Sequence, residues 1–384
     1  MASDRLIDYI RWRGDLSFET CPLSLADSVI LCELSYIDFT QVLEPNSPAG
    51  ITLREAFKRI EEEECFQLLT AAGGTDELAR AAAMSERFGL LKLTHYTDVS
   101  DLSSIQFAAV HFELNNLTSY IAFRGTDNTI IGWKEDFMMS FQCVPAQESA
   151  AEYLSGTMSK DRDYYVGGHS KGGNLAVYAA SKLSVQERRH LLRIFVNDAP
   201  GFDPDVYDMK AILELKPLIT KITPAYGMIG QMFRLDSDTS YIVKSSASGI
   251  LQHDLETWLM DGPSLAFADA FEPGAVILQN SFNKWIENVD EDGRKVLVDL
   301  LFDSLSAIGA ITVGDIGVKD MPEVLKAILS AGKEAKEIVM DLPKSYFAEA
   351  GKLIQEVLNE RLNTLAAQKE KKEQSEPNEG QNEL

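Results

Sequence analysis

Residues 165–176 read YVGGHSKGGNLA: a short apolar stretch, a glycine-rich turn and the start of a helical pattern. Gly168, Ser170 and Gly172 place a serine between two glycines in the pattern G-x-S-x-G. Glycine has no β-carbon, so glycines on both sides of the serine allow a strand and a helix to approach each other closely. The stretch therefore predicts a strand that ends at a sharp, strained turn and a helix that begins directly after it.

A serine held on such a turn has its hydroxyl exposed above the carboxyl edge of the sheet, where it can act as a nucleophile. The helix directs its first N–H groups toward the same point, and the backbone N–H of Lys171 would donate to an oxyanion. Phosphate-binding turns are also rich in glycine, but the pattern G-x-x-x-x-G-K-[ST] is absent here. Adjacent residues on the turn point apart, so we expect His169 to pack or orient rather than act as the base.

A serine nucleophile needs a general base, and in hydrolases with this turn the chain order is serine, acid, histidine. Three of the five histidines precede Ser170, and His190 lies in the charged stretch 187–190. His253 remains, in a loop after the predicted strand 240–245, and we expect it to be the base. The alternative is a surface histidine at the start of a short helix over 255–259.

The acid of the triad has several candidates. Asp198 directly follows the predicted strand 193–196, and catalytic groups gather at the carboxyl ends of strands in open α/β sheets. We therefore favour Asp198 over Asp236 and Asp238, which precede the last predicted strand, and over Asp203. A turn or helix-capping aspartate is the alternative interpretation of Asp198.

The rest of the chain alternates between stretches typical of strands and stretches with the hydrophobic period of helices. Short apolar or β-branched stretches predict strands over 104–112, 118–123, 162–167, 193–196, 218–222 and 240–245, the first two as a hairpin. Helical periodicity appears over 27–36, 54–69, 76–88, 174–183 and 281–288. This alternation predicts an α/β fold with a mostly parallel central sheet and flanking helices over residues 1–290. A helical region over 291–368 and a polar, disordered tail over 369–384 are expected to follow.

A second element precedes the serine, where the segment Tyr120–Asp127 reads YIAFRGTD. This fold places its other oxyanion donor in such a position, so we expect the N–H of Thr126, helped by its hydroxyl, to donate. The F-R-G-T run, the later Trp133 and Asp136, and the G-H-S-x-G-G turn resemble class 3 (fungal-type) lipases. The resemblance implies an α/β-hydrolase fold.

The chain is more similar to a bacterial family of lipase-like α/β-hydrolases, over roughly residues 16–284. The shared segments are F-R-G-T-D, G-H-S-K-G-G-N-L-A, D-x-P-G-F from Asp198 and Q-H-D-x-x-x-W from Gln252. Class 3 lipases carry their acid after the next strand, yet residues 222–227 (ITPAYG) hold no acid. This departure is the reason for placing the acid at Asp198.

These features predict a serine hydrolase that cleaves carboxylic esters, with lipid-like esters as the favoured class. Ser170, His253 and Asp198 would form the triad, and Thr126 and Lys171 would bind the oxyanion of an acyl-enzyme mechanism. The alternative is a catalytically silent protein of the same fold that acts as a binding scaffold. The missing late acid is the observation that supports it.

Composition narrows the possible partners. The formal net charge of −23 argues against nucleic acid and against anionic lipid surfaces, which attract basic patches. The four cysteines lack metal-site spacing and are expected to be reduced thiols of a cytoplasmic protein, with no metal or cofactor. No signal peptide or transmembrane segment is expected. The expected partner is a small-molecule or lipid ester, and nothing indicates the oligomeric state.

Overall fold

A computed structural model gives the fold of the chain. It describes residues 4–69, 76–101, 105–126, 134, 138–139, 142–287, 289 and 293–295. The expected helical region 291–368, apart from residues 293–295, and the tail 369–384 lie outside the described residues, as do Trp133 and Asp136.

The centre of the fold is an eight-stranded sheet in which the strands follow one another in chain order. The first four strands pair antiparallel, and β5 to β9 pair parallel, so the sheet is mostly parallel as expected. The strands are β2 (Ile51–Thr52), β3 (Lys92–Asp101), β4 (Ile105–Glu113), β5 (Thr118–Phe123), β6 (Asp163–His169), β7 (Leu191–Asn197), β8 (Ile219–Pro224) and β9 (Thr239–Val243).

The order of the parallel strands determines where the connecting helices lie. Crossovers between parallel strands are right-handed, so strands added in one direction place their helices on one face. These helices are α7 (Pro145–Thr157), α8 (Lys171–Lys182), α9 (Val185–Arg188) and α10 (Met209–Leu213). One buried apolar cluster joins α7, α8 and α10 to strands β4 to β8.

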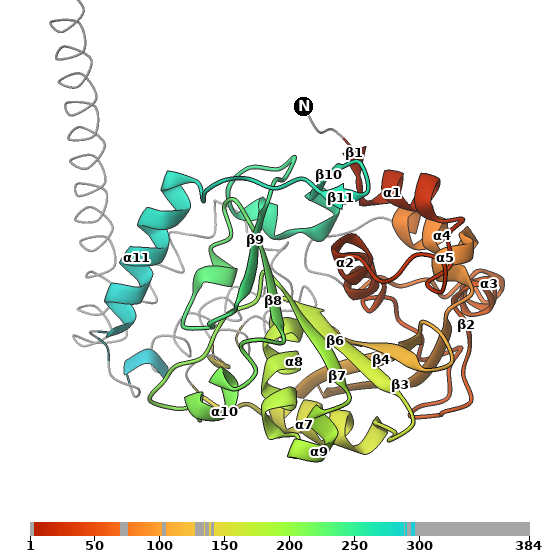
Figure 1. The fold of residues 1–384 in the computed structure, drawn as a ribbon, viewed down its shortest axis with the longest axis horizontal. Helices are drawn as coiled ribbons and strands as arrows, with labels where there is room; N and C mark the ends of the chain where they lie inside the picture. The colour runs from red at the N-terminus through yellow and green to blue at the C-terminus, as the bar shows by residue number, and fades with distance from the viewer. Residues whose placement is uncertain are drawn as a thin grey trace, which may run out of the picture.

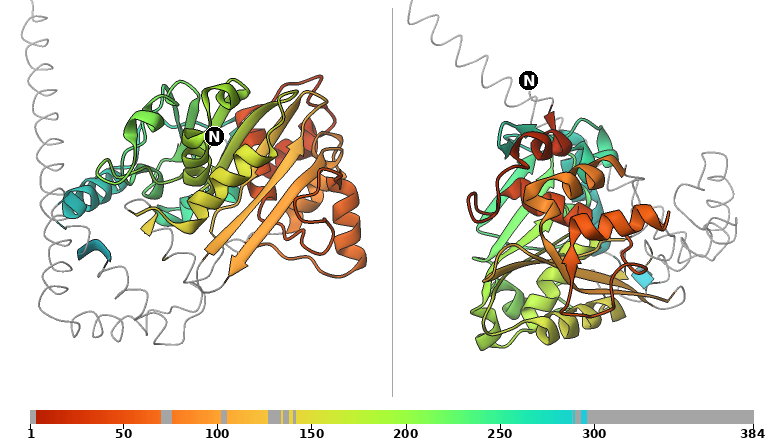
Figure 2. Two further views of the ribbon diagram at one scale, coloured as in Figure 1. Left: turned by 90° about the horizontal axis from the view of Figure 1, so that it is seen from below. Right: turned by 90° about the vertical axis from the view of Figure 1, so that its right-hand side faces the viewer.

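The opposite face is covered by helices from the start of the chain, which form a second apolar cluster with the sheet. Figure 1 shows these helices at the right and α7 to α9 at the bottom, and Figure 2 shows the strands between the two groups. The covering helices are α1 (Leu6–Arg13), α2 (Leu25–Leu34), α3 (Leu53–Glu62), α4 (Asp76–Met84) and α5 (Glu86–Gly89). No helix of the described residues is long and apolar enough to cross a membrane.

Smaller elements complete the fold after β8. Three short 3-10 helices are η1 (Ile229–Gln231), η2 (Gly249–His253) and η3 (Leu255–Thr257), and α11 (Pro273–Glu287) ends the well-described part of the chain. A separate three-stranded sheet ties the N-terminus to the region after β9, through β1 (Asp4–Arg5), β10 (Leu259–Asp261) and β11 (Ser264–Leu265).

The predicted hairpin is confirmed, since β4 and β5 pair antiparallel across residues 114–117. The other predicted strands and helices are present with small shifts, with three exceptions. The helix α3 ends at Glu62, the helix expected over 76–88 is interrupted, and the helix expected from residue 281 begins at Pro273. Ser85 accepts a hydrogen bond from the N–H of Phe88 and starts a new helix there. The helix expected over 255–259 is the 3-10 helix η3.

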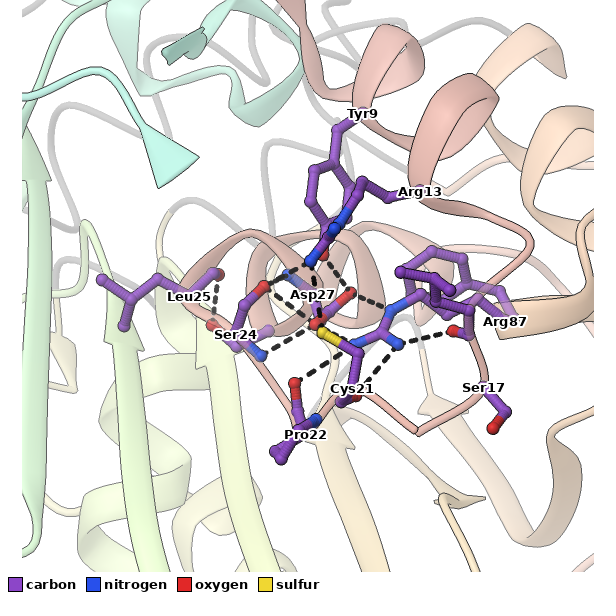
Figure 3. Close-up of polar contacts among 12 residues, drawn as sticks. Tyr9, Arg13, Ser17, Cys21, Pro22, Ser24, Leu25, Asp27 and Arg87 are labelled. Carbon is purple, nitrogen blue, oxygen red and sulfur yellow. Dashed lines mark hydrogen bonds and ion pairs between the residues drawn. The ribbon is translucent and has the colours of Figure 1, made fainter. Parts of the chain in front are cut away.

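A buried ion pair connects the N-terminal helices to one another. The Arg87 guanidinium donates to both carboxylate oxygens of Asp27, at 2.7 and 2.6 Å, and both side chains are almost completely buried. It also donates to the carbonyls of Leu16, Cys21 and Pro22 and lies 3.9 Å from the centre of the Phe18 ring. Figure 3 shows the contacts that converge on this pair, including the Tyr9 hydroxyl on Asp27.

We expect Arg87→Met to lower the free energy of unfolding by about 3–5 kcal/mol, because it leaves the Asp27 carboxylate buried without its partner. Arg80→Met is the matched control, since Arg80 forms its ion pairs on the surface, and it should change stability little. Adding Asp27→Leu to Arg87→Met should recover part of the loss. Urea unfolding measures all three; equal losses for Arg87→Met and Arg80→Met would contradict the interpretation.

Candidate active site

Ser170 lies at the turn between β6 and α8, as the glycine pattern predicts. Its backbone has φ 55° and ψ −128°, a conformation that L-residues rarely adopt, and Lys171 is the first residue of the helix. The Ser170 N–H donates to the carbonyl of Asn197 at 3.0 Å, which ties the turn to the end of the neighbouring strand β7. A strained serine between a strand and a helix is typical of hydrolase nucleophiles.

The glycines around the serine are required by close backbone contacts. A β-carbon at Gly168 would lie 2.2 Å from the backbone of Gly172, and one at Gly172 would lie 2.1 Å from the Phe123 carbonyl oxygen. No side chain fits at either distance, so the glycines allow α8 to begin directly against β5 and β6. The expected reason for this pattern is therefore confirmed.

Asp198 directly follows β7, beside the turn that carries Ser170. It is completely buried and, like the serine, has a positive φ of 43°. The carboxylate accepts a hydrogen bond from Nδ1 of His253 at 2.6 Å and one from the N–H of Gly230 at 2.9 Å. Because Nδ1 donates to the carboxylate, the Nε2 atom of a neutral His253 carries the lone pair that a general base needs.

The segment around His253 is held by hydrogen bonds that the sequence does not reveal. The Gln252 side chain accepts from the N–H of Tyr226 and donates to Glu272, and the backbone carbonyl of Gln252 accepts from the Trp258 indole at 2.9 Å. The Asp254 carboxylate caps η3 by accepting from the N–H of Glu256. Gln252, Asp254 and Trp258, the residues that the Q-H-D-x-x-x-W segment specifies beside His253, thus fix the backbone on both sides of that histidine.

The three other candidate acids are engaged elsewhere. Asp236 pairs with Arg234 at 2.7 Å, Asp238 with Lys216 at 3.0 Å, and Asp203 with Arg294. His190 pairs with Asp163 at the opposite end of β6. The structure therefore brings Asp198 to His253 and leaves the alternatives in separate ion pairs.

His169 binds the backbone of His253 and so helps to orient it, as expected from the place of His169 in the turn. Its Nε2 donates to the His253 carbonyl at 2.9 Å, its ring centre lies 4.4 Å from that of His253, and its Nδ1 accepts from the Tyr36 hydroxyl at 3.0 Å. Burial and the nearby His253 hold the pKa of His169 well below its usual range. A neutral His169 with Nε2–H fits both bonds, since a carbonyl only accepts.

The expected oxyanion donors lie next to the serine. Gly125 packs closely against the turn that carries Ser170: a β-carbon at Gly125 would lie 2.5 Å from the His169 carbonyl oxygen. Thr126 is the next residue. Lys171 is the first residue of α8, at the positive end of the helix dipole. The side chains of Thr126 and Lys171 are both buried.

No hydrogen bond joins the Ser170 hydroxyl to His253 among the contacts of the described residues. The two lie together nonetheless: His169, which precedes the serine, contacts His253, and the Ser170 N–H binds the residue before Asp198. Within the described part of the chain, no group of three or more histidine, cysteine or acidic side chains is arranged to hold a metal ion.

Two contributors to the site were not predicted. Asn174 in α8 donates to the carbonyls of Pro200 and Gly201, both at 3.2 Å, and so fastens the segment after Asp198 to the helix. Tyr36 reaches His169 from the loop after α2. The N-L-A letters after the turn were a signal for Asn174, whereas nothing in the local sequence singles out Tyr36.

A buried acid lies behind the His253 segment. Glu33 of α2 is buried, and burial raises its pKa to about 8, with Glu256 and Asp254 adding repulsion. Burial also raises the pKa of Asp254. At neutral pH Glu33 is therefore mainly uncharged, and its ionisation would place a further negative charge against the loop that carries His253.

Comparison with known proteins identifies one family. A family model described as Mbeg1-like matches residues 82–303, more than half of the 384 residues. No curated protein matches the chain. Among solved structures, the crystal structure of M37 lipase is similar at 15% sequence identity and a TM-score of 0.32, covering 53% of this chain and 69% of that one.

We expect Glu33→Gln to stabilise the protein at alkaline pH. The pKa of Glu33 is raised on folding, from 4.5 to about 8, so the fold keeps a proton that the unfolded chain releases. Its contribution is most favourable below pH 4.5, is lost progressively up to about pH 8, and is constant above. Thermal unfolding should show Glu33→Gln several degrees above wild type at pH 8.5 and equal to it near pH 4.5.

The exposed Glu63→Gln is the matched control and should show no such pH dependence. A Glu33→Gln difference that stayed constant between pH 4.5 and 8.5 would contradict the assignment of a raised pKa.

Proposed function

The chain belongs to the Mbeg1-like family, and we propose that it is a serine hydrolase that cleaves carboxylic esters. The observation that carries the proposal is the 2.6 Å hydrogen bond between His253 and the buried Asp198, beside a serine on a strained strand-to-helix turn. A histidine that donates Nδ1–H to a buried carboxylate is oriented and prepared to take a proton at Nε2. Four free cysteines support a cytoplasmic setting.

In the proposed mechanism, Nε2 of His253 takes the proton of the Ser170 hydroxyl as the oxygen attacks the ester carbonyl carbon. The N–H groups of Lys171 and Thr126 donate to the oxyanion, each contributing on the order of 2–4 kcal/mol in the transition state. The imidazolium, stabilised by Asp198, returns the proton to the alcohol oxygen as the ester bond breaks. Water, activated by His253, then hydrolyses the acyl-enzyme and regenerates Ser170.

The hydrogen bond between serine and histidine would form when substrate binds, since catalytic hydrogen bonds commonly tighten only in the Michaelis complex. Resemblance to class 3 lipases in the F-R-G-T segment and in the turn supports lipid-like esters as the substrate class. The second candidate function is a silent scaffold, and the absent serine–histidine bond is the observation in its favour.

Labelling with a fluorophosphonate probe separates the two functions, because the probe reacts only with an activated serine. We expect folded wild type to be labelled, and labelling to vanish in Ser170→Ala and to fall at least 100-fold in His253→Ala. Asp198→Asn should slow labelling strongly as well, because it removes the charge that stabilises the imidazolium. Esters of p-nitrophenol with different acyl lengths then report turnover.

The matched controls are Ser155→Ala and His190→Ala, whose side chains are bonded to Glu187 and Asp163 away from the site. Both should label as wild type. Folded wild type that stays unlabelled, even with detergent present, would support the scaffold instead.

Tyr36→Phe should lower kcat by roughly tenfold with little change in KM, because Tyr36 fixes the His169 ring that holds the His253 carbonyl. The loss should be accompanied by a changed pH profile of kcat/KM, since the orientation of His253 sets its basicity toward the serine. Steady-state kinetics on a p-nitrophenyl ester measures both. An unchanged pH profile would indicate that Tyr36 only packs.

A further inference from the structure

A cavity lies against the sheet beyond Asp198. It is a cavity of about 770 Å³ between β8 and β9, the loops at 203–205 and 231–236, and one side of α11. Neither Ser170 nor His253 lines it. This size is within the range of small-molecule sites.

Lys221 stands in this cavity at a position where the fold otherwise places apolar residues. In the sheet, Lys221 lies beside Val196, and Ile219, two residues earlier on the same face, lies beside Ile194. Those three neighbours belong to the buried apolar cluster under α8. Apolar packing does not explain a lysine next to these apolar residues at the wall of a cavity.

The Lys221 ammonium has no ion pair or hydrogen bond with any described residue. By contrast, the nearby Lys216 pairs with Asp238 at 3.0 Å on the surface. Burial lowers the pKa of Lys221, while Asp198 and Asp236 act at longer range in the opposite direction. A partly buried cation without a direct partner is costly, and a bound anion would offset this cost.

Thr223, two residues further along the same face of β8, is the second polar group of the cavity. It is buried, and its hydroxyl oxygen has no hydrogen-bond partner among the described residues. Buried hydroxyls are nearly always bonded, so an unsatisfied one in a cavity wall is available to a bound ligand or water. Lys221 and Thr223 thus present two donors side by side on one strand.

The remaining lining determines the class of anion. Three cations, Lys221, Arg234 and Arg294, are balanced by the carboxylates of Asp203, Asp205 and Asp236, so a dianion is disfavoured. Arg234 and Arg294 are already paired with Asp236 and Asp203. Apolar walls come from Phe233, Leu235, Ile242 and Phe271. Two donors beside an apolar wall fit a monocarboxylate with a hydrocarbon part.

We propose that this cavity is a binding site for a small organic carboxylate, whose oxygens are bound by the Lys221 ammonium and the Thr223 hydroxyl. The site is distinct from the catalytic one but adjoins it. Gly230, which donates to Asp198, belongs to η1 at the cavity wall, and a β-carbon there would lie 3.0 Å from the Thr223 hydroxyl oxygen.

Hexanoate binding to full-length Ser170→Ala, measured by calorimetry, tests the proposal independently of any hydrolase activity. We expect Lys221→Met to weaken hexanoate binding at least tenfold, and Thr223→Val to weaken it several-fold. Lys216→Met, the matched surface lysine, should leave it unchanged. Hexanol, which lacks the charge, and inorganic phosphate should bind at least tenfold more weakly than hexanoate.

Equal hexanoate affinity in Lys221→Met and its parent, or no binding at all, would overturn the proposal. Stronger binding of inorganic phosphate than of hexanoate would overturn the carboxylate class. If Lys221→Met does not fold, Thr223→Val and Lys221→Gln decide the result. In wild-type protein labelled at Ser170, hexanoate should still bind; its exclusion there would place the carboxylate in the catalytic site and overturn the separate cavity.

Discussion

The close approach of α8 to β5 and β6 is the constraint on which the site depends. It leaves no room for a β-carbon at Gly168 or Gly172. Because the helix begins so close to the strands, the turn is sharp, Ser170 is strained, and its N–H reaches the end of β7. Asp198 is the next residue after Asn197, so two candidate catalytic side chains lie at the ends of neighbouring strands. A larger residue at either glycine would separate the helix from the sheet and disperse this arrangement.

The crossover helices cover only one face of the sheet, so other elements must cover the opposite apolar face. Strands added in one direction put all their helices on one side, and the opposite apolar face would be exposed without α1 to α5. The same N-terminal region supplies Glu33 in α2 and Tyr36 in the loop after it; Tyr36 binds His169, and Glu33 lies behind the segment that carries His253. The buried Arg87–Asp27 pair holds the covering helices in one arrangement, so the geometry of the site depends on packing far from the serine.

Much of this organisation was predictable from the sequence, and the failures have physical causes. The turn around Ser170 was predicted because its constraint is local, and β4, β5 and α8 because their periodicity is strong. The strand β3 (KLTHYTDVSD) was missed because its polar residues hide the alternation, and α7 because it carries few large apolar residues. The helix α1 is apolar along one side but has only eight residues, too few to show a clear period. The three-stranded sheet joins residues 4–5 to 259–265, and Tyr36 reaches His169 across 133 positions. Contacts between such distant segments leave no pattern in either one.

Positive φ angles at Ser170 and Asp198 have a consequence for the stability of the chain. Each costs on the order of 1–3 kcal/mol, and glycine would relieve this strain, but at Asp198 it would also remove the carboxylate that binds His253 and Gly230. Under the proposed mechanism, Ser170 and Asp198 are two positions at which the chain gives up stability in return for activity.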